Sequence, residues 1–288
     1  MTVRNFVPEI WSSRLLVATR KELVYAGPRV VNRDYEGEIS EAGDTVRITS
    51  VSRPAIGNYV PGTTVITPEK LTTGQRTLVV DQSKYWAFSI DDVDKRQAKS
   101  ALIPQAMSEA AYGLADTVDQ YVAGLYTQIA AGNFLNLVGS PIDTYTAPTD
   151  AYDKVLVPLR TRLTKANVPK AGRYVVVSAE FYASLLLDSR FIKADEAGTD
   201  QGLRNGFVGR AAGFDIYESN NVPNPSGDTQ VITAGTNAAI TFAEQINKTE
   251  AYRPESSFSD AVKGLALYGA KVVRPDHLAA AFINPTAA

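Results

Sequence analysis

The sequence predicts an α+β fold that is built around one long helix and several separate groups of strands. Three observations support this prediction. Residues 105–132 carry apolar side chains at helical spacing, and residues 43–92 contain two stretches that alternate between apolar and polar side chains. Residues 151–243 mix short apolar runs with helical segments, which is typical of a small mixed α/β unit.

The composition limits what the chain can be. Its 288 residues are 44% hydrophobic, which is enough for a sizeable core in one elaborate domain or two ordinary ones. The 29 basic and 31 acidic residues give a net charge of −2, so no global basic character favours nucleic-acid binding. The absence of cysteine excludes disulfides, thiolate metal sites and cysteine nucleophiles. We expect no membrane association, because no apolar run approaches the length of a membrane span and the first residues lack the apolar core of a secretory signal.

The predicted long helix, the spine, spans residues 105–132 and would be about 42 Å long at a rise of 1.5 Å per residue. Pro104 suits its first turn, and Gly132 with Asn133 is a plausible left-handed stop. The apolar residues recur every three or four positions and so form one stripe. They are Met107, Ala111, Leu114, Val118, Val122, Leu125 and Ile129. The opposite face is expected to meet solvent. Its polar residues are Glu109, Asp116, Asp119 and Gln120.

Two segments before the spine are predicted to be arms. Residues 1–42 contain a short helical pattern with Trp11 and Leu15 on one face, which either folds back on its own core or lies on a neighbour. Residues 43–92 predict a two-stranded β-arm, with strands near 46–49 and 86–91 and a long proline- and glycine-rich tip. An isolated ribbon is marginal in water, so we expect this arm to lie on another surface, a partner chain in preference to its own domain.

The remaining chain predicts short elements in alternation. Asp150 is expected to cap a helix up to residue 163, in which Pro158 should cause a kink or move the start. A buried strand, a short helix and a polar surface loop follow, and four further strands complete the chain. The segments in question are 174–178, 180–187, 191–209, 214–217, 230–233, 239–242 and 261–273.

The sequence contains no motif that identifies a catalytic, cofactor-binding or metal-binding residue. The only histidine, His277, has no Gly-x-Ser-x-Gly motif to accompany it, so a structural role is favoured. The acidic cluster at 91–94 lacks the glycine and glutamate of a calcium loop. Residues 264–271 resemble a phosphate-binding loop but have Ala270 in the place of the lysine, and the glycines of 206–213 have the wrong spacing for a dinucleotide loop. A dispersed active site leaves no local signature, so a soluble α+β enzyme remains an alternative.

Several segments, taken in order along nearly the whole chain, resemble one family. These segments are 6–11, 35–39, 42–46, 174–182, 188–191, 204–223, 251–255, 261–264 and 268–272. The family is the major capsid proteins of tailed bacteriophages. The resemblance implies the Hong Kong 97-type (HK-97) capsid fold. Its parts here would be an N-terminal arm at 1–42, an extended β-arm (E-loop) at 43–92, a peripheral domain at 93–150 and 244–288 with the spine helix, and an axial domain at 151–243.

The resemblance also implies a function. Copies of the chain would assemble into hexamers and pentamers that form an icosahedral head shell around double-stranded DNA, without sequence-specific binding, in the cytoplasm of the bacterial host. The implied partners are other copies of the chain, a separate scaffolding protein, a portal protein and a decoration protein. Candidate intersubunit residues are Trp11, Leu15, Arg53, Tyr59, Glu69 and Lys70. Some family members cross-link an arm lysine to a neighbour's asparagine, but an ion pair is the favoured role for Lys70. An encapsulin-like nanocompartment shell protein is a further alternative.

Overall fold

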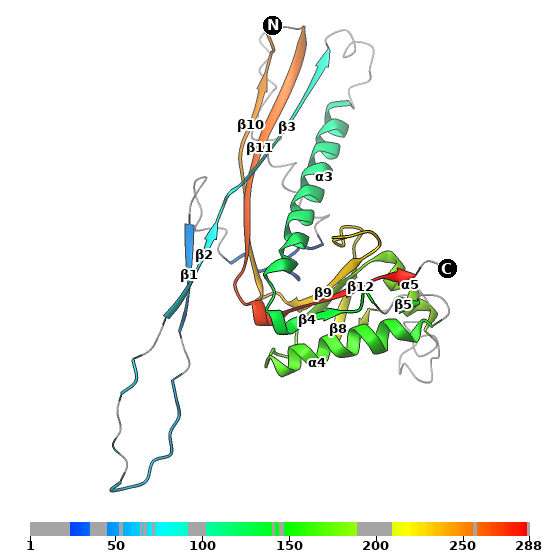
Figure 1. The fold of residues 1–288 in the computed structure, drawn as a ribbon. Coiled ribbons are helices and arrows are strands. Elements are labelled where there is room, and N and C mark those ends of the chain that lie inside the picture. The colour runs from blue at the N-terminus through cyan, green and yellow to red at the C-terminus, as the bar shows by residue number, and fades with distance from the viewer. Residues whose placement is uncertain are drawn as a thin grey trace.

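The structure, a computed structural model, describes residues 24–34, 45–51, 54–63, 65, 68–70, 73–91, 102–139, 142–143, 147–188, 209–255 and 258–286. In Figure 1 a mixed α/β unit lies at one end of a tall three-stranded sheet, and a long helix runs beside that sheet. A two-stranded ribbon carries a loop that projects away from both. The predicted α+β class is therefore confirmed. The predictions for Trp11, Leu15, Arg53 and nearly all of the loop at 191–209 lie outside the described residues.

The spine helix is α3 (Leu102–Ala123), and its apolar stripe is buried as predicted. The predicted end at residue 132 is wrong. The chain passes at Gly124 into the 3-10 turns η2 (Gly124–Gln128) and η3 (Ala131–Asn133), and Ile129, the first of the two residues between them, is extended. Glycine lowers helix stability, and the tighter turns still place Leu125 and Ile129 in the core. Gly132 does not adopt the expected left-handed conformation.

The tall sheet is antiparallel and has the order β10 (Ile240–Tyr252), β11 (Ser259–Val272), β3 (Gln82–Asp91). One of its faces packs on the spine, where the stacked rings of Trp86 and Phe88, 5.7 Å apart, contact Met107 and Ala111. Trp86 lies over Gly264, its directly opposite neighbour on β11, where a β-carbon would come within 2.4 Å of the indole. The glycines that resemble a phosphate loop in the sequence therefore provide room for packing.

The two-stranded ribbon pairs β1 (Thr45–Val51) with β2 (Thr73–Val79). The predicted partner of the first strand, at 86–91, is wrong, because that segment belongs to β3 and pairs with β11. The difference arises because Trp86 and Phe88 bury their rings against the spine, which fixes β3 in the tall sheet. Part of the opposite face of the tall sheet is covered by the ribbon. Leu78 of β2 and Val80, which follows β2, pack there against Ala243 and Leu267.

The α/β unit contains a six-stranded sheet with the order β4-β12-β9-β6-β8-β7. The strands are β4 (Phe134–Asn136), β12 (Leu278–Ile283), β9 (Gln230–Thr236), β6 (Arg173–Val177), β8 (Phe214–Glu218) and β7 (Arg210–Ala211). One face packs on the spine, and the other on α4 (Val157–Lys165) and α5 (Ala179–Leu187). β5 (Ile142–Asp143) pairs with β13 (Pro285–Thr286), and η5 (Pro275–His277) precedes β12. The sheet thus includes strands from outside residues 151–243.

The expected disturbance at Pro158 takes the form of a π-helical turn. Residues Ala151–Leu156 form this turn, η4, and Pro158 lies in the first turn of α4, where it needs no backbone hydrogen-bond donor. Asp150 does not cap the helix as predicted. Its carboxylate instead forms an ion pair with Lys154, with 2.6 Å between Oδ2 and Nζ.

We predict that Gly269→Ala destabilises the subunit. A β-carbon at position 269 would lie 2.3 Å from the carbonyl oxygen of Val79 and 2.9 Å from the α-carbon of Val80, and backbone atoms cannot rotate away. Overpacking of this kind costs about 1–3 kcal/mol, measurable by denaturant unfolding of dissociated subunits. The control is Gly113→Ala, which meets no atom within 4 Å and sits in α3, so it should be neutral or stabilising. Equal stability of the two variants would contradict the close packing of the ribbon on β11.

Candidate subunit interface

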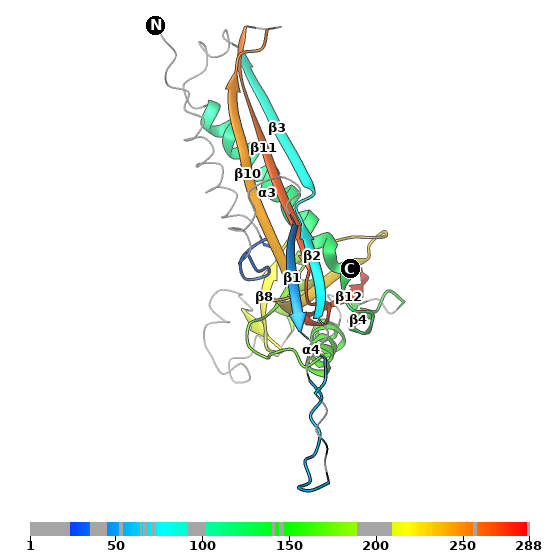
Figure 2. The same ribbon diagram turned by 90° about the vertical axis from the view of Figure 1, so that its left-hand side faces the viewer.

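The segment between β1 and β2 is exposed along its whole described length. Its described residues, 54–63, 65 and 68–70, are here called the arm loop. Both views show it leaving the body of the chain (Figures 1 and 2). Ile56 and Val65 are 94% and 86% exposed, and Tyr59 and Val60 are also mostly exposed. Apolar side chains gathered on a projecting loop are typical of a binding surface.

The arm loop has internal hydrogen bonds that shape it. The backbone N–H of Ala55 donates to the Glu69 carboxylate at 3.0 Å, which ties the two sides of the loop together. At the tip, the N–H of Thr63 donates to the carbonyl of Val60 at 3.2 Å, and Gly62 has a positive φ of 77°. The turn therefore has a defined backbone geometry although its side chains face solvent.

A second exposed apolar surface lies on the far face of the tall sheet, above the part that Leu78 and Val80 cover. Tyr85 on β3 and Leu265 on β11 are direct cross-strand neighbours there, and Tyr85 is 83% exposed. Beside them Lys263 forms an ion pair with Glu250 at 3.1 Å and lies 5.2 Å from the ring centre of Tyr252. We call this surface, formed by Tyr85, Leu265, Lys263 and Tyr252, the open face.

The predicted interface residues fall into two groups. Tyr59, Glu69 and Lys70 lie together on the arm loop and are exposed, whereas Trp11, Leu15 and Arg53 lie outside the described residues. Sequence reasoning missed Ile56, Val65 and the open face. The signal for the first two was available, because each is a large apolar residue within a proline- and glycine-rich stretch. The open face depends on how three distant strands pair and has no local signal.

The carboxylate of Asp119 joins three parts of the chain in the interior. The prediction that Asp119 faces solvent is wrong, since it is only 3% exposed. Its Oδ1 accepts hydrogen bonds from the backbone N–H groups of Val24, Tyr25 and Ala26 at 2.9, 2.6 and 3.2 Å. Its Oδ2 accepts one from Asn221 Nδ2 at 3.1 Å. Burial raises the pKa of Asp119 above its ordinary value, and these hydrogen bonds oppose that rise.

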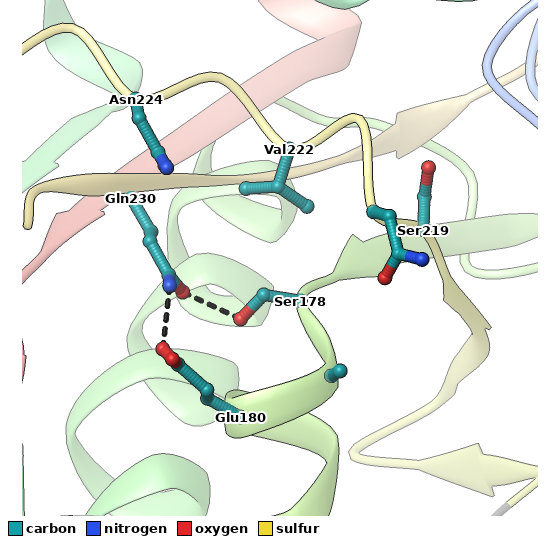
Figure 3. A pocket seen from close by; sticks show the side chains of 8 residues that line it. Ser178, Glu180, Ser219, Val222, Asn224 and Gln230 are labelled. Carbon is teal, nitrogen blue, oxygen red and sulfur yellow. Dashed lines mark hydrogen bonds between the residues drawn. The ribbon is translucent and has the colours of Figure 1, made fainter. Parts of the chain in front are cut away.

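A shallow polar pocket of about 170 Å³ lies where the parallel strands β6 and β8 end. This is the edge at which open α/β sheets commonly bind ligands. Figure 3 shows the side chain of Gln230 between Ser178, which donates to its carbonyl oxygen, and Glu180, which accepts from its amide at 2.6 Å. The Ser178 hydroxyl also accepts from the N–H of Phe181 and so caps α5. These groups satisfy one another, and the arrangement pairs no nucleophile with a base.

His277 lies elsewhere, in the short turn η5 before β12. Its Nδ1 is 3.2 Å from the hydroxyl of Thr236, and burial lowers its pKa. This placement agrees with the structural role that the sequence favoured. Within the part of the chain that the structure describes, no three His, Asp or Glu residues gather in a way that could hold a metal ion. Among the described helices, none is long and apolar enough to cross a membrane.

Comparison with known proteins defines the class. The chain resembles a structure from Mycobacterium phage Che8 with a TM-score of 0.74 and 31% identity, over 98% of this chain and 94% of that one. The capsid of cyanophage P-SCSP1u is similar with a TM-score of 0.69 and 18% identity, covering 86% and 85% of the two chains. The mature capsid of bacteriophage PhiM1 is similar with a TM-score of 0.68 and 16% identity, over 84% of this chain and 83% of that one. No curated protein matches the chain.

These likenesses define a capsid protein with the HK-97-type fold. The profile of the family described as "Phage capsid protein" matches residues 73–281, and the chain belongs to that family. It is a major capsid protein of a tailed phage, a structural component of the virion capsid. The resemblance identified in the sequence is thus confirmed.

We predict that Asp119→Ala costs roughly 3 kcal/mol or more of unfolding free energy, because buried N–H donors lose their acceptor at about 1–3 kcal/mol each. Asp119→Asn should cost about 1 kcal/mol, since an amide oxygen can still accept the three backbone N–H groups. Denaturant unfolding of dissociated subunits measures both. If the alanine and asparagine variants were equally stable, the three backbone hydrogen bonds would not be what Asp119 contributes.

Proposed function

We propose that this capsid protein assembles into hexamers and pentamers that close an icosahedral shell, and that each subunit's arm loop lies on a neighbour. The observation that carries the proposal is the arm loop itself. The loop leaves the body of the chain in both views (Figures 1 and 2), and its apolar side chains, among them Ile56 and Val65, are exposed. Because no described part of the chain covers them, we infer that a neighbouring copy does.

The open face is the surface that suits this loop. Its lower continuation is already covered, within the chain, by Leu78 and Val80 at the end of the chain's own ribbon, so the face is shaped to accept a ribbon. Tyr85 and Leu265 offer apolar area, and Lys263 offers a charge at the margin. This division into an apolar centre and a polar rim is that of protein interfaces in general.

The energetics favour a shell of many modest contacts. Complete burial of a side chain such as Ile56 or Val65 contributes about 1.5–3 kcal/mol, and part of that offsets the entropy lost on association. One arm contact is therefore weak by itself. In a closed shell every subunit both gives and receives such a contact, so the contacts reinforce one another through high effective concentration.

The domain assignment follows the same proposal. Residues 1–42 are the N-terminal arm and 43–92 the extended β-arm, except that β3 lies in the tall sheet. Residues 93–150 and 244–288 are the peripheral domain and 151–243 the axial domain, to whose sheet β4 and β12 also contribute. Assembly takes place in the cytoplasm of the bacterial host with a separate scaffolding protein, a portal protein and a decoration protein. The shell encloses double-stranded DNA without sequence-specific binding, which the net charge of −2 supports, and the protein has no catalytic activity.

We predict that the double variant Ile56→Ser/Val65→Ser folds but does not form shells, because both side chains are exposed in the subunit and lose apolar contact only at the interface. Size-exclusion chromatography with electron microscopy measures the assembled fraction. The control is Val138→Ser, which removes an exposed valine outside the arm loop and should leave assembly intact.

Normal shells from the double variant would contradict the role of the arm loop. Particles of the unaltered protein also decide between a phage head and an encapsulin-like compartment, since the first contains DNA and the second encloses protein cargo. The ratio of ultraviolet absorbance at 260 and 280 nm separates the two.

A further inference from the structure

Residues 24–34, here called the wedge, lie between the spine, the tall sheet and the six-stranded sheet. Four of their apolar side chains are almost fully buried: Tyr25, Ala26, Val30 and Val31. They belong to the same core cluster as Leu114 and Val118 of α3 and as Tyr174 and Val176 of β6. The wedge therefore fills the space in which the peripheral and axial parts of the chain meet.

The wedge is strongly attached on its peripheral side. Asp119 of α3 accepts its three backbone N–H groups, as described above. Asn32 bonds to β10 in both directions, with its N–H on the Ile240 carbonyl at 2.8 Å and its carbonyl on the Phe242 N–H at 2.9 Å. Arg33 lies over the ring of Phe242 at 4.9 Å and 3.7 Å from the carboxylate of Glu244.

The polar attachment on the axial side consists of fewer and more exposed contacts. Arg29 donates to the hydroxyl of Tyr217 on β8 at 3.0 Å, and Arg29 is exposed. Asn221, in the loop after β8, donates to Asp119 at 3.1 Å and is half-buried. Both contacts join single side chains, whereas every one of the five peripheral hydrogen bonds involves a backbone group of the wedge.

We propose that the wedge moves with the spine and the tall sheet, and that Asn221 and Tyr217 form a latch that sets the angle of the axial part against it. Asn221 and Tyr217 are then positioning residues for the geometry of the shell. A rotation of the axial part would break the two side-chain hydrogen bonds at the latch and strain the buried apolar contacts and the Asn133 hydrogen bonds that also join the six-stranded sheet to the spine. The opposite rotation of the wedge would break at least five hydrogen bonds on its peripheral side, three to Asp119 and two to β10.

The inference rests on the proposed shell. One variant tests both the hydrogen bonds of the latch in the subunit and their effect on the diameter of the shell. Asn221→Ala/Tyr217→Phe removes the two latch hydrogen bonds and keeps the aromatic ring. Hydrogen–deuterium exchange on dissociated subunits should show exchange at least about tenfold faster in residues 214–224 and unchanged exchange in residues 24–26. The melting temperature should fall by no more than about 6 °C, because a tenfold change corresponds to about 1.4 kcal/mol and each kcal/mol shifts it by about 2–4 °C in a domain of this size class.

In assembled particles the same variant should give shells in normal yield with a shifted or broadened distribution of diameters, measured by electron microscopy. The control, Asn224→Ala, alters an exposed asparagine of the same loop and should match the unaltered protein in exchange and diameter. Unchanged exchange and diameter in the latch variant, or a large loss of melting temperature, would overturn the inference. If the unaltered protein forms no shells, the proposed function fails, and the exchange experiment still decides the latch.

Discussion

The body of this protein depends on the apolar stripe of α3, because three separate parts of the chain pack on it. The wedge, the tall sheet and the six-stranded sheet share one core cluster with that stripe. Asp119 lies on the same helix and binds the wedge and Asn221 through one buried carboxylate. A single helix thereby positions the wedge, the tall sheet and the six-stranded sheet, and a change in its packing would affect all three.

The rest of the described chain covers only part of the ribbon formed by β1 and β2. The end of β2 is covered because Leu78 and Val80 find Leu267 and Ala243 on the tall sheet. Beyond that point none of the described residues covers the arm loop, and its apolar side chains are exposed. The open face is likewise an exposed apolar surface, on the tall sheet. Two exposed apolar surfaces on one chain suit a protein that tiles a shell, because a surface of one copy can cover a surface of another.

Local patterns in the sequence predicted the elements well and their partners less well. The stripe of α3, the buried strand β6 and the helix α5 follow from periodicity, which depends on near neighbours alone. The pairing of β1 with β2 and of β3 with β11 depends on packing between residues far apart, such as Trp86 on Gly264. Asp119 was assigned to solvent because its hydrogen-bond donors lie 93–95 residues away. The exposed arm loop was predictable from its composition, whereas the open face required the fold.

The central claim is that this chain is completed by its copies, and a cryo-electron microscopy reconstruction of the assembled particle tests it most directly. The account predicts density for the arm loop of each subunit on the open face of a neighbour, with Ile56 and Val65 against Tyr85 and Leu265. A reconstruction in which the arm loop folds onto its own subunit, or in which the open face meets only solvent, would contradict the account.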